Sequence, residues 1–349
     1  MAFLCLQILR LPLGVNQFPD STFWQVVSAQ MSHAAWTGMT AWDLIQPLFM
    51  FMVGISLPWS ISTRRASGQT TGEMWRHAWW RSFVFVLLGL MLVSLENERT
   101  NFEFTNVLTQ IGLGYPLLFG LALTRVRTQV VVAVFIPVLV TVVYAVTPEG
   151  WQKNSGPGAA FDLWFLNLFP RESVFSGDDG GYTTLNFLPS MVTMLLGSLA
   201  GEWLRSGREA SQLLRGLIIT SAALLAVGLA LDFTGLCPSI KRIWTPAFVL
   251  ITGGLMGGLL ALCYWLMDVR GWSKPFELLR IVGMNSLILY IVLRLWDPFL
   301  PDFVSTHLGW NILSFLPEAA GTFVARLLGV GLLLAFCVWL HQRRIYIKV

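Results

Sequence analysis

Charged residues are scarce in this chain of 349 residues, where Asp, Glu, Lys and Arg together make up 12%. Soluble globular proteins carry roughly 25% of these residues, so a soluble globular class is excluded. Hydrophobic residues make up 55% of the chain and gather in long runs. A helix needs about 20 mostly apolar residues to cross a bilayer, and many of the runs reach that length. The composition therefore predicts a polytopic membrane protein whose immediate partner is the lipid bilayer.

Histidine and cysteine are also scarce, with four of each. Three cysteines lie within apolar runs and the fourth stands alone at the end of one, which is not the pattern of a disulfide framework. The histidines are His33, His77, His307 and His341. None is spaced with His33 as a metal-binding pair, so the sequence predicts no metal site.

Nine apolar segments are long enough to be read as full membrane helices. They are 42–62, 79–95, 105–124, 128–147, 183–204, 212–232, 244–267, 276–296 and 319–340. The segments lack the alternation of barrel strands, so we expect them all to be helical. The opening "MAFLCLQILRLPLG" is too short to span and predicts a partial helix. The expected fold is an all-α transmembrane bundle that forms a single integral membrane domain over residues 1–349.

The basic residues predict an orientation for these helices. The loops after the first, third, fifth, seventh and ninth segments hold fifteen Lys and Arg residues, and the opposite loops hold five. The positive-inside rule places the richer set in the cytoplasm, and it also explains the net charge of +4 without a nucleic-acid partner. His33 and the long loop 148–182 then lie on the extracytoplasmic side.

Two polar residues stand at the start of the first full segment, and each has a structural and a functional interpretation. Thr40 and Asp43 have the spacing of a capping box, and an acid in the first turn also suits the helix dipole. His33 precedes them among tryptophans, as in an interfacial aromatic belt, but an imidazole can also exchange a proton near neutral pH or accept an acyl group. Gln46 and Pro47 follow, and the proline predicts a kink that lines a cavity.

Several sequence motifs resemble the heparan-α-glucosaminide N-acetyltransferase family. The stretch "SHAAWTGMTAWDLIQPLFMFMVGIS" resembles the family signature H-x-x-W-x-G-x-x-x-x-D-L-I-x-P-x-F-x-F-x-V-G. Further likenesses are "NVLTQIGLGY", "FDLWFLNLFPR", "GYTTLNFLPSMVTMLLGSLAG", "CPSIKRIWTPAFVL" and "GMNSLILY", so that the resemblance covers about residues 8 to 346. Members usually begin with an S-L-D-x-x-R-G element and a complete first helix. This chain is therefore expected to be N-terminally truncated relative to the family.

The resemblance implies a membrane acetyltransferase that uses acetyl-CoA from the cytosolic side. The acetyl group would reach the amino group of a glucosamine-type sugar or envelope glycan on the far side, in a bacterial inner membrane. The family's catalytic histidine matches His33, and Asp43 or a nearby carbonyl could orient its ring. Asn285 or Gln110 could donate to the tetrahedral oxyanion, and Asp162 in the 148–182 loop could pair with the acceptor ammonium. The residues expected at the substrates are Trp36, Gln46, Gln110, Asp162, Lys241, Trp244 and Asn285.

Two other functions remain open at this point. A transporter or flippase of an envelope glycan would use the same kind of bundle, although no clear internal repeat is visible. An inactive member of the family is the other alternative. A homodimer is compatible with any of the three.

Overall fold

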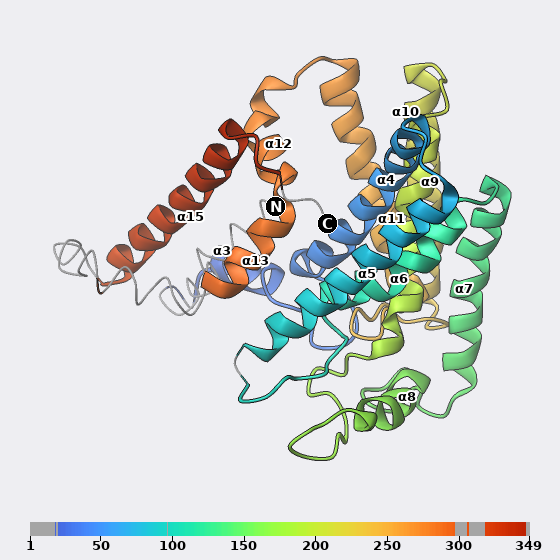
Figure 1. The fold of residues 1–349 in the computed structure, drawn as a ribbon. Coiled ribbons are helices and arrows are strands. Elements are labelled where there is room, and N and C mark those ends of the chain that lie inside the picture. The colour runs from blue at the N-terminus through green and yellow to red at the C-terminus, as the bar shows by residue number, and fades with distance from the viewer. Residues whose placement is uncertain (1–17, 19, 96, 297–305, 307–317, 347–349) are drawn as a thin grey trace. The chain divides into compact units, whose positions relative to one another are not determined.

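The structure of this chain is a computed structural model that describes residues 18, 20–95, 97–296, 306 and 318–346. Every regular element in these residues is a helix, as the apolar segments predict (Figure 1). The chain divides into two units. One is continuous, His33–Arg270, and the other combines Met1–Ser32 with Gly271–Val349. The predicted partial helix at residues 1–14 lies outside the described residues.

The His33–Arg270 unit holds most of the long helices. A short 3-10 turn, η2 (Ala41–Leu44), leads into the first of them. The helices are α4 (Ile45–Ala66), α5 (Thr71–Ser94), α6 (Val107–Ala122), α7 (Val126–Val146), α8 (Pro157–Phe165), α9 (Phe187–Leu204), α10 (Ala210–Phe233) and α11 (Pro246–Tyr264). The short α8 was not predicted, because it lies inside the segment 148–182, which the sequence analysis treats as a loop.

The other unit holds α3 (Thr22–Gln30), α12 (Glu277–Met284), α13 (Ser286–Trp296) and α15 (Glu318–Gln342). The axes of α12 and α13 meet at a bend of 65°. Asn285 stands at this break, and its side-chain Nδ2 donates to the carbonyl oxygen of Ile345 at 3.1 Å. The predicted continuous segment 276–296 is therefore two helices joined at a buried asparagine.

The prediction of nine full membrane segments is not confirmed. In the described chain six helices are long and apolar enough to cross a membrane, or seven if the bent α12–α13 pair counts as one span. Each predicted segment does coincide with a helix, but three are not counted as spans. α6 has only 16 residues, 276–296 is broken, and of α15 only Arg326–Gln342 enters the count. Apolar composition locates the helices correctly, but it does not report the break or the short length.

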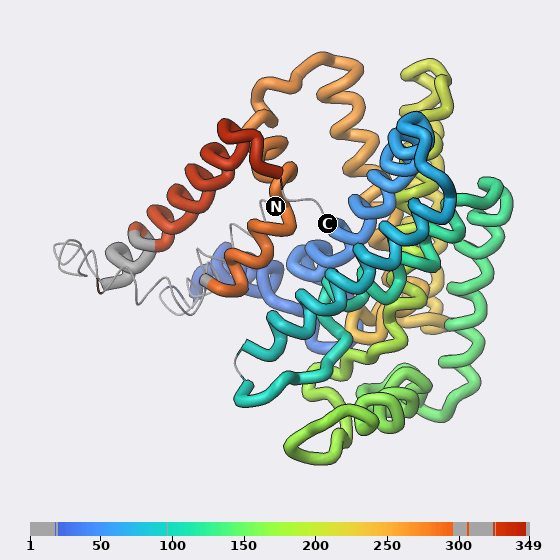
Figure 2. The backbone as a smooth tube through the Cα atoms, in the orientation of Figure 1, coloured from blue at the N-terminus to red at the C-terminus, as the bar shows by residue number. Residues whose placement is uncertain are grey.

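The helices of the His33–Arg270 unit differ strongly in burial. About two-thirds of the apolar window of α9 is buried (67%), against 17% of that of α7, which runs along one edge of the unit (Figure 2). The exposed residues of α5 and α7 are large and apolar, such as Trp80, Phe83, Val131 and Phe135. Such surfaces suit lipid rather than water, because soluble monomers rarely expose large continuous apolar patches.

Glycines set the contact between α4 and α9. A Cβ atom added at Gly54 would lie 1.8 Å from the carbonyl oxygen of Met194, and one added at Gly197 would lie 2.1 Å from that of Phe51. Backbone atoms cannot yield as the end of a flexible side chain can, so any larger residue must separate the helices. The structure confirms that Gly197, which begins a Gly-x-x-x-Gly pattern, serves close helix packing.

Gly54→Ala is therefore expected to destabilise the protein by about 1–3 kcal/mol or more, the usual cost of overpacking a tight contact. Gly258→Ala is the matched control, since nothing lies within 4 Å of a Cβ added at that helical glycine. The control should keep or raise the melting temperature, because alanine favours helix by about 1 kcal/mol over glycine. Thermal unfolding in detergent measures both, and equal melting temperatures for the two variants would contradict this packing.

Three irregular segments of the unit meet at one end of its helices. The Trp36 Nε1–H donates to the carbonyl oxygen of Trp151 at 2.8 Å, and Arg171 Nη2 donates to that of Phe102 at 2.6 Å. The segments 33–40, 97–105 and 148–183 therefore share one face. Arg64 and Arg65 lie at the opposite end of α4, which agrees with the grouping predicted from charge. Arg76 and Arg81 were counted with the loop that follows the first segment, but both lie within α5.

The orientation across the membrane stays a prediction, and cysteine labelling tests it. In a background without native cysteines, cysteines placed at Ser32 and Asp178 should react with an impermeant maleimide in intact cells. A cysteine at Ser67, which follows α4, should react only after the membrane is broken. Labelling of the Ser67 position alone in intact cells would mean the reverse orientation.

Candidate active site

Asp43 organises the chain around His33. Its Oδ2 accepts hydrogen bonds from the backbone N–H groups of Ala34 and Thr40, both at 3.1 Å, and from the Thr40 hydroxyl at 3.0 Å. Its Oδ1 lies 2.7 Å from His33 Nδ1. The side chain is 1% exposed, so these bonds stand in for the water that burial removes. The capping box is confirmed, and the same carboxylate also holds the histidine.

This contact fixes the tautomer of a neutral His33. An ionised carboxylate only accepts, so Nδ1 must carry the hydrogen that faces Asp43 Oδ1. The lone pair of the neutral ring then lies on Nε2. The His33 side chain is 44% exposed, while its partner is buried. A histidine oriented by a carboxylate in this way can take up a proton or attack an acyl group through Nε2.

Lys241 is the third member of the group. Its Nζ lies 3.2 Å from Asp43 Oδ1 and 3.1 Å from His33 Nδ1. Because Nδ1 already donates to Asp43 over the shorter distance, the ammonium pairs with the carboxylate rather than with the ring. Burial lowers the pKa of Lys241, and the Asp43 carboxylate opposes that effect. The charge of Lys241 therefore depends on Asp43.

A tight connection between two segments brings Lys241 to this place. Gly38 and Ile240 form an isolated parallel bridge, in which the Gly38 N–H donates to the carbonyl oxygen of Ser239 at 2.8 Å. Gly38 has a φ of +89°, which glycine adopts without strain. Trp244 has a φ of +49°, a conformation that is energetically costly for a bulky residue. Contacts with the surrounding residues must stabilise it. The buried indole of Trp244 supplies one of these contacts, since Nε1 donates to Thr193 Oγ1 at 3.2 Å.

Arg242 joins the same site to the 148–183 segment, and the sequence analysis missed this role. Its Nη1 donates to the carbonyl oxygen of Gly180 at 2.7 Å, and its guanidinium lies 5.6 Å from the Tyr182 ring centroid. The carbonyl oxygen of Arg242 accepts from Asn186 Nδ2 at 2.7 Å. The sequence feature that could have indicated this role is the adjacent pair Lys241 and Arg242. It lies on the predicted extracytoplasmic side, where basic residues are few. Trp36, through its bond to Trp151, ties the His33 segment to the same region.

For three other predicted site residues the structure shows only their own surroundings. Gln110 is buried, and its amide Nε2 donates to the carbonyl oxygens of Phe104 and Thr184 at 2.7 and 3.2 Å, so a role at an oxyanion requires an exchange of partners. Gln46 lies in the first turn of α4, half-buried and three residues after Asp43. Asn285 belongs to the other unit. The substrate contacts proposed for these residues stay predictions.

Pro47 does not have the predicted effect on α4. The helix begins at Ile45, so the proline lies in its first turn, where the missing N–H has no partner within the helix. Pro58 is the proline inside α4. Within the described residues no three His, Cys, Asp or Glu side chains gather as a metal site would need.

Asp162 is buried rather than open to an acceptor. It lies in α8 with 1% of its surface exposed, and its Oδ2 accepts from the Thr184 N–H at 2.8 Å. Its Oδ1 has no hydrogen-bond partner among the described residues. Burial raises the pKa of Asp162 to about 6, against the smaller opposing effect of the Thr184 bonds. Its direct contact with an acceptor ammonium stays a prediction.

The raised pKa of Asp162 predicts a pH-dependent stability. The folded state holds the proton more tightly than the unfolded state, so stability falls as the pH rises from about 4 to about 6, by about 3 kcal/mol. Asp162→Asn keeps an acceptor for Thr184 and removes this fall, so its melting temperature should vary less across that window. The exposed Asp179→Asn is the control and should follow the wild type. Parallel curves for Asp162→Asn and the wild type would refute the assignment.

The helices and this His–Asp–Lys group define a class, that of an integral membrane protein in which a buried carboxylate holds a partly exposed histidine. No family model matches the chain. A curated protein does: the human heparan-α-glucosaminide N-acetyltransferase is 24% identical over 342 aligned positions, which cover 77% of this chain. The chain spans about half the length of that relative (49%). The predicted resemblance is thus confirmed as a distant relationship, which supports a general acyltransferase function.

Proposed function

We propose that this protein is a membrane acetyltransferase that moves the acetyl group of acetyl-CoA to the amino group of a glucosamine-type sugar. The observation that carries the proposal is the His33–Asp43 pair, which leaves Nε2 as the free lone pair of an exposed ring. The name of the human relative, an N-acetyltransferase of a glucosaminide, points to the same chemistry. The acceptor side is assigned to the face where segments 33–40 and 148–183 meet.

In the first of two mechanisms both substrates are bound together. His33 Nε2 takes a proton from the sugar ammonium, and the resulting amine attacks the thioester carbonyl carbon. The N–C bond forms, the C–S bond breaks, and the CoA thiolate leaves and takes up a proton. Asp43 stays ionised and accepts from both Nδ1–H and Lys241, so it stabilises the imidazolium that forms.

In the second mechanism His33 carries the acetyl group itself. Nε2 attacks the thioester, CoA leaves as the thiolate, and an acetyl-imidazole remains. The sugar amine then attacks this carbonyl and returns the imidazole to its starting state. Ping-pong kinetics indicate this route, whereas a requirement for both substrates before CoA release indicates the first.

The donor is assigned to the opposite face. Arg64 and Arg65 lie in the last turn of α4, where guanidinium groups suit the phosphates of CoA. The 22 residues of α4 extend about 33 Å, so the acetyl end of the donor must reach deep into the bundle from that face. Gln46, near the other end of α4, is then placed to meet the acetyl end.

Acetyl-CoA turnover by the purified full chain, with a panel of amino sugars, tests the proposal. We expect CoA release that depends on a primary sugar amine, and none with an already N-acetylated sugar. A transporter is the second candidate, because the broken α12–α13 pair is the kind of interrupted helix that transporters use. Uptake of an amino sugar into proteoliposomes without CoA release would favour the transporter and contradict the enzyme.

A further inference from the structure

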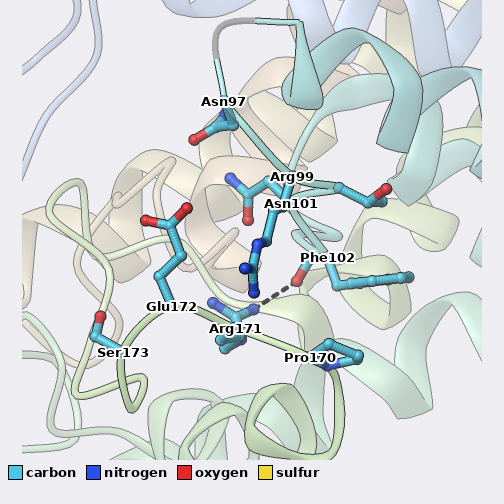
Figure 3. A pocket seen from close by; sticks show the side chains of 9 residues that line it. Asn97, Arg99, Asn101, Phe102, Pro170, Arg171, Glu172 and Ser173 are labelled. Atoms are coloured by element: carbon cyan, nitrogen blue, oxygen red, sulfur yellow. Dashed lines mark hydrogen bonds between the residues drawn. The ribbon is translucent and has the colours of Figure 1, made fainter.

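A polar hollow opens between the α5–α6 connection and the chain that follows α8 (Figure 3). Its volume is about 160 Å³, several times the roughly 30 Å³ that a water molecule occupies in the liquid. The lining includes Asn97, Arg99, Asn101, Phe102, Arg171 and Glu172. The hollow therefore has room for a group much larger than a single ion or water, and basic, acidic and amide side chains all line it.

Arg171 is held in place at the hollow. Its Nε donates to the carbonyl oxygen of Leu166 at 2.7 Å, and its Nη2 donates to that of Phe102 at 2.6 Å. A guanidinium has five N–H donors, so three remain after these two bonds. Because the Arg171 side chain is already fixed, a ligand that binds those donors does not pay the entropy cost of ordering the side chain.

Arg99 and Glu172 line the same hollow and are exposed. Among the described residues no carboxylate lies within 4.0 Å of the guanidinium of Arg99 or Arg171, and no cation lies that close to Glu172. Side chains of both charges thus line one small space without an ion pair between them. A simple anion would meet Glu172, and a simple cation would meet the two arginines.

A sugar ring matches this lining better than either ion. Each sugar hydroxyl both donates and accepts, and neighbouring hydroxyls present pairs of polar atoms. Guanidinium, carboxylate and amide groups are planar and present paired donors or acceptors in return. Phe102 contributes its carbonyl oxygen, which accepts from Arg171, while its ring extends away and is stacked on Phe169 with centroids 4.9 Å apart (Figure 3).

We infer that this hollow binds a sugar residue of the acceptor glycan other than the one that receives the acetyl group. The inference rests on the proposed function for the identity of the glycan. The hydrogen bond of Arg171 joins segments 97–105 and 148–183. The hydrogen bond of Trp36 joins the His33 segment to the same end of the helices. The hollow and His33 therefore belong to segments on the same end of the helices, and we assign both to the acceptor glycan.

The test compares binding and turnover for acceptors of different length. Binding is measured with the β-1,4-linked tetramer of N-acetylglucosamine, whose acetylated nitrogens cannot accept a further group, so it reports on the hollow without turnover. Turnover is measured with glucosamine and with its tetramer. The variants are Arg99→Ala and Glu172→Gln, and Glu98→Gln is the control, since Glu98 is exposed in the same connection but does not line the hollow.

We expect Arg99→Ala and Glu172→Gln to raise the Kd of the acetylated tetramer and the KM of the glucosamine tetramer by about ten-fold, the loss of one charged hydrogen bond. The KM of glucosamine itself and kcat should not change, and Glu98→Gln should change neither quantity. Failure of the wild type to bind the acetylated tetramer, or a Kd unaffected by both variants, overturns the hollow as a sugar site.

The two proposals fail separately. Binding that depends on Arg99, with no acetyl transfer to any acceptor, supports the hollow and contradicts the enzyme. Acetyl transfer with a KM that is independent of chain length and of Arg99 supports the enzyme and overturns the hollow.

Discussion

Replacing His33 by alanine is expected to lower kcat for acetyl transfer by about 10²–10⁴-fold, the usual contribution of a positioned acid–base group. The physical reason is the loss of Nε2, whose lone pair the Asp43 contact leaves available. The fold should survive, because the side chain is 44% exposed and contributes little packing. Turnover of acetyl-CoA with a glucosamine acceptor measures the change, and the melting temperature in detergent checks the fold.

His77→Ala is the control for this prediction. His77 lies near the start of α5, in the half of that helix away from the 97–105 segment. Its replacement removes an imidazole without touching the His33 group, so turnover should stay near that of the wild type. If His33→Ala folds normally and turns over like the wild type, the catalytic role is wrong.

Asp43→Asn is expected to damage both activity and stability. An asparagine amide facing His33 no longer requires the hydrogen on Nδ1, and the comparable change in serine proteases lowers kcat about 10⁴-fold. Lys241 also loses its counter-charge, and breaking a buried pair on one side costs about 3–5 kcal/mol. Burial already lowers the pKa of Lys241, so the cost should shrink as the pH rises and the lysine loses its proton.

A second change separates the two effects of Asp43→Asn. In the double variant Asp43→Asn, Lys241→Met the buried positive charge is absent, so most of the lost stability should return. Activity should stay low, because the histidine is still misoriented. Recovery of activity together with stability would show that Asp43 acts only through folding. Unfolding by denaturant at two pH values, measured beside turnover, distinguishes these cases.

Local patterns predict the part of this site that lies close together in sequence. The Thr40–Asp43 spacing predicts the capping box, and the capping box forms. His33 is ten residues from Asp43, and both belong to the one signature that the chain resembles. The contact of the histidine with Asp43 could therefore be predicted from the sequence, although the ring nitrogen that makes it could not.

Contacts between distant segments could not be predicted in the same way. Lys241 meets His33 across 208 positions of the sequence, through a bridge at Gly38 and a turn at Trp244. No spacing rule reports such a meeting, since it depends on how two loops pack. Gln110 was proposed as a catalytic donor from its polarity alone, and the sequence did not indicate that its amide Nε2 donates to two backbone carbonyl oxygens.

Membrane helices show the same division between local and tertiary information. Apolar runs locate the predicted helices of the described chain to within about four residues at each end, because the backbone in lipid has few alternatives. The exception is α5, which begins at Thr71 rather than at the predicted 79, because its first turns carry polar and charged residues. The break at Asn285 is a tertiary feature, since the residue is held by a carbonyl oxygen 60 positions further on. Counting apolar residues therefore does not distinguish one continuous span from two shorter helices joined at a break.

Transfer of label from radioactive acetyl-CoA in sealed proteoliposomes tests the central claim most directly. The donor is supplied on one side of the membrane and glucosamine on the other, with wild-type protein or His33→Ala in the bilayer. The account predicts labelled N-acetylglucosamine in the acceptor compartment for the wild type, and a loss of at least about a hundred-fold for His33→Ala. Absence of labelled product in both arrangements of donor and acceptor, or undiminished product with His33→Ala, would contradict it.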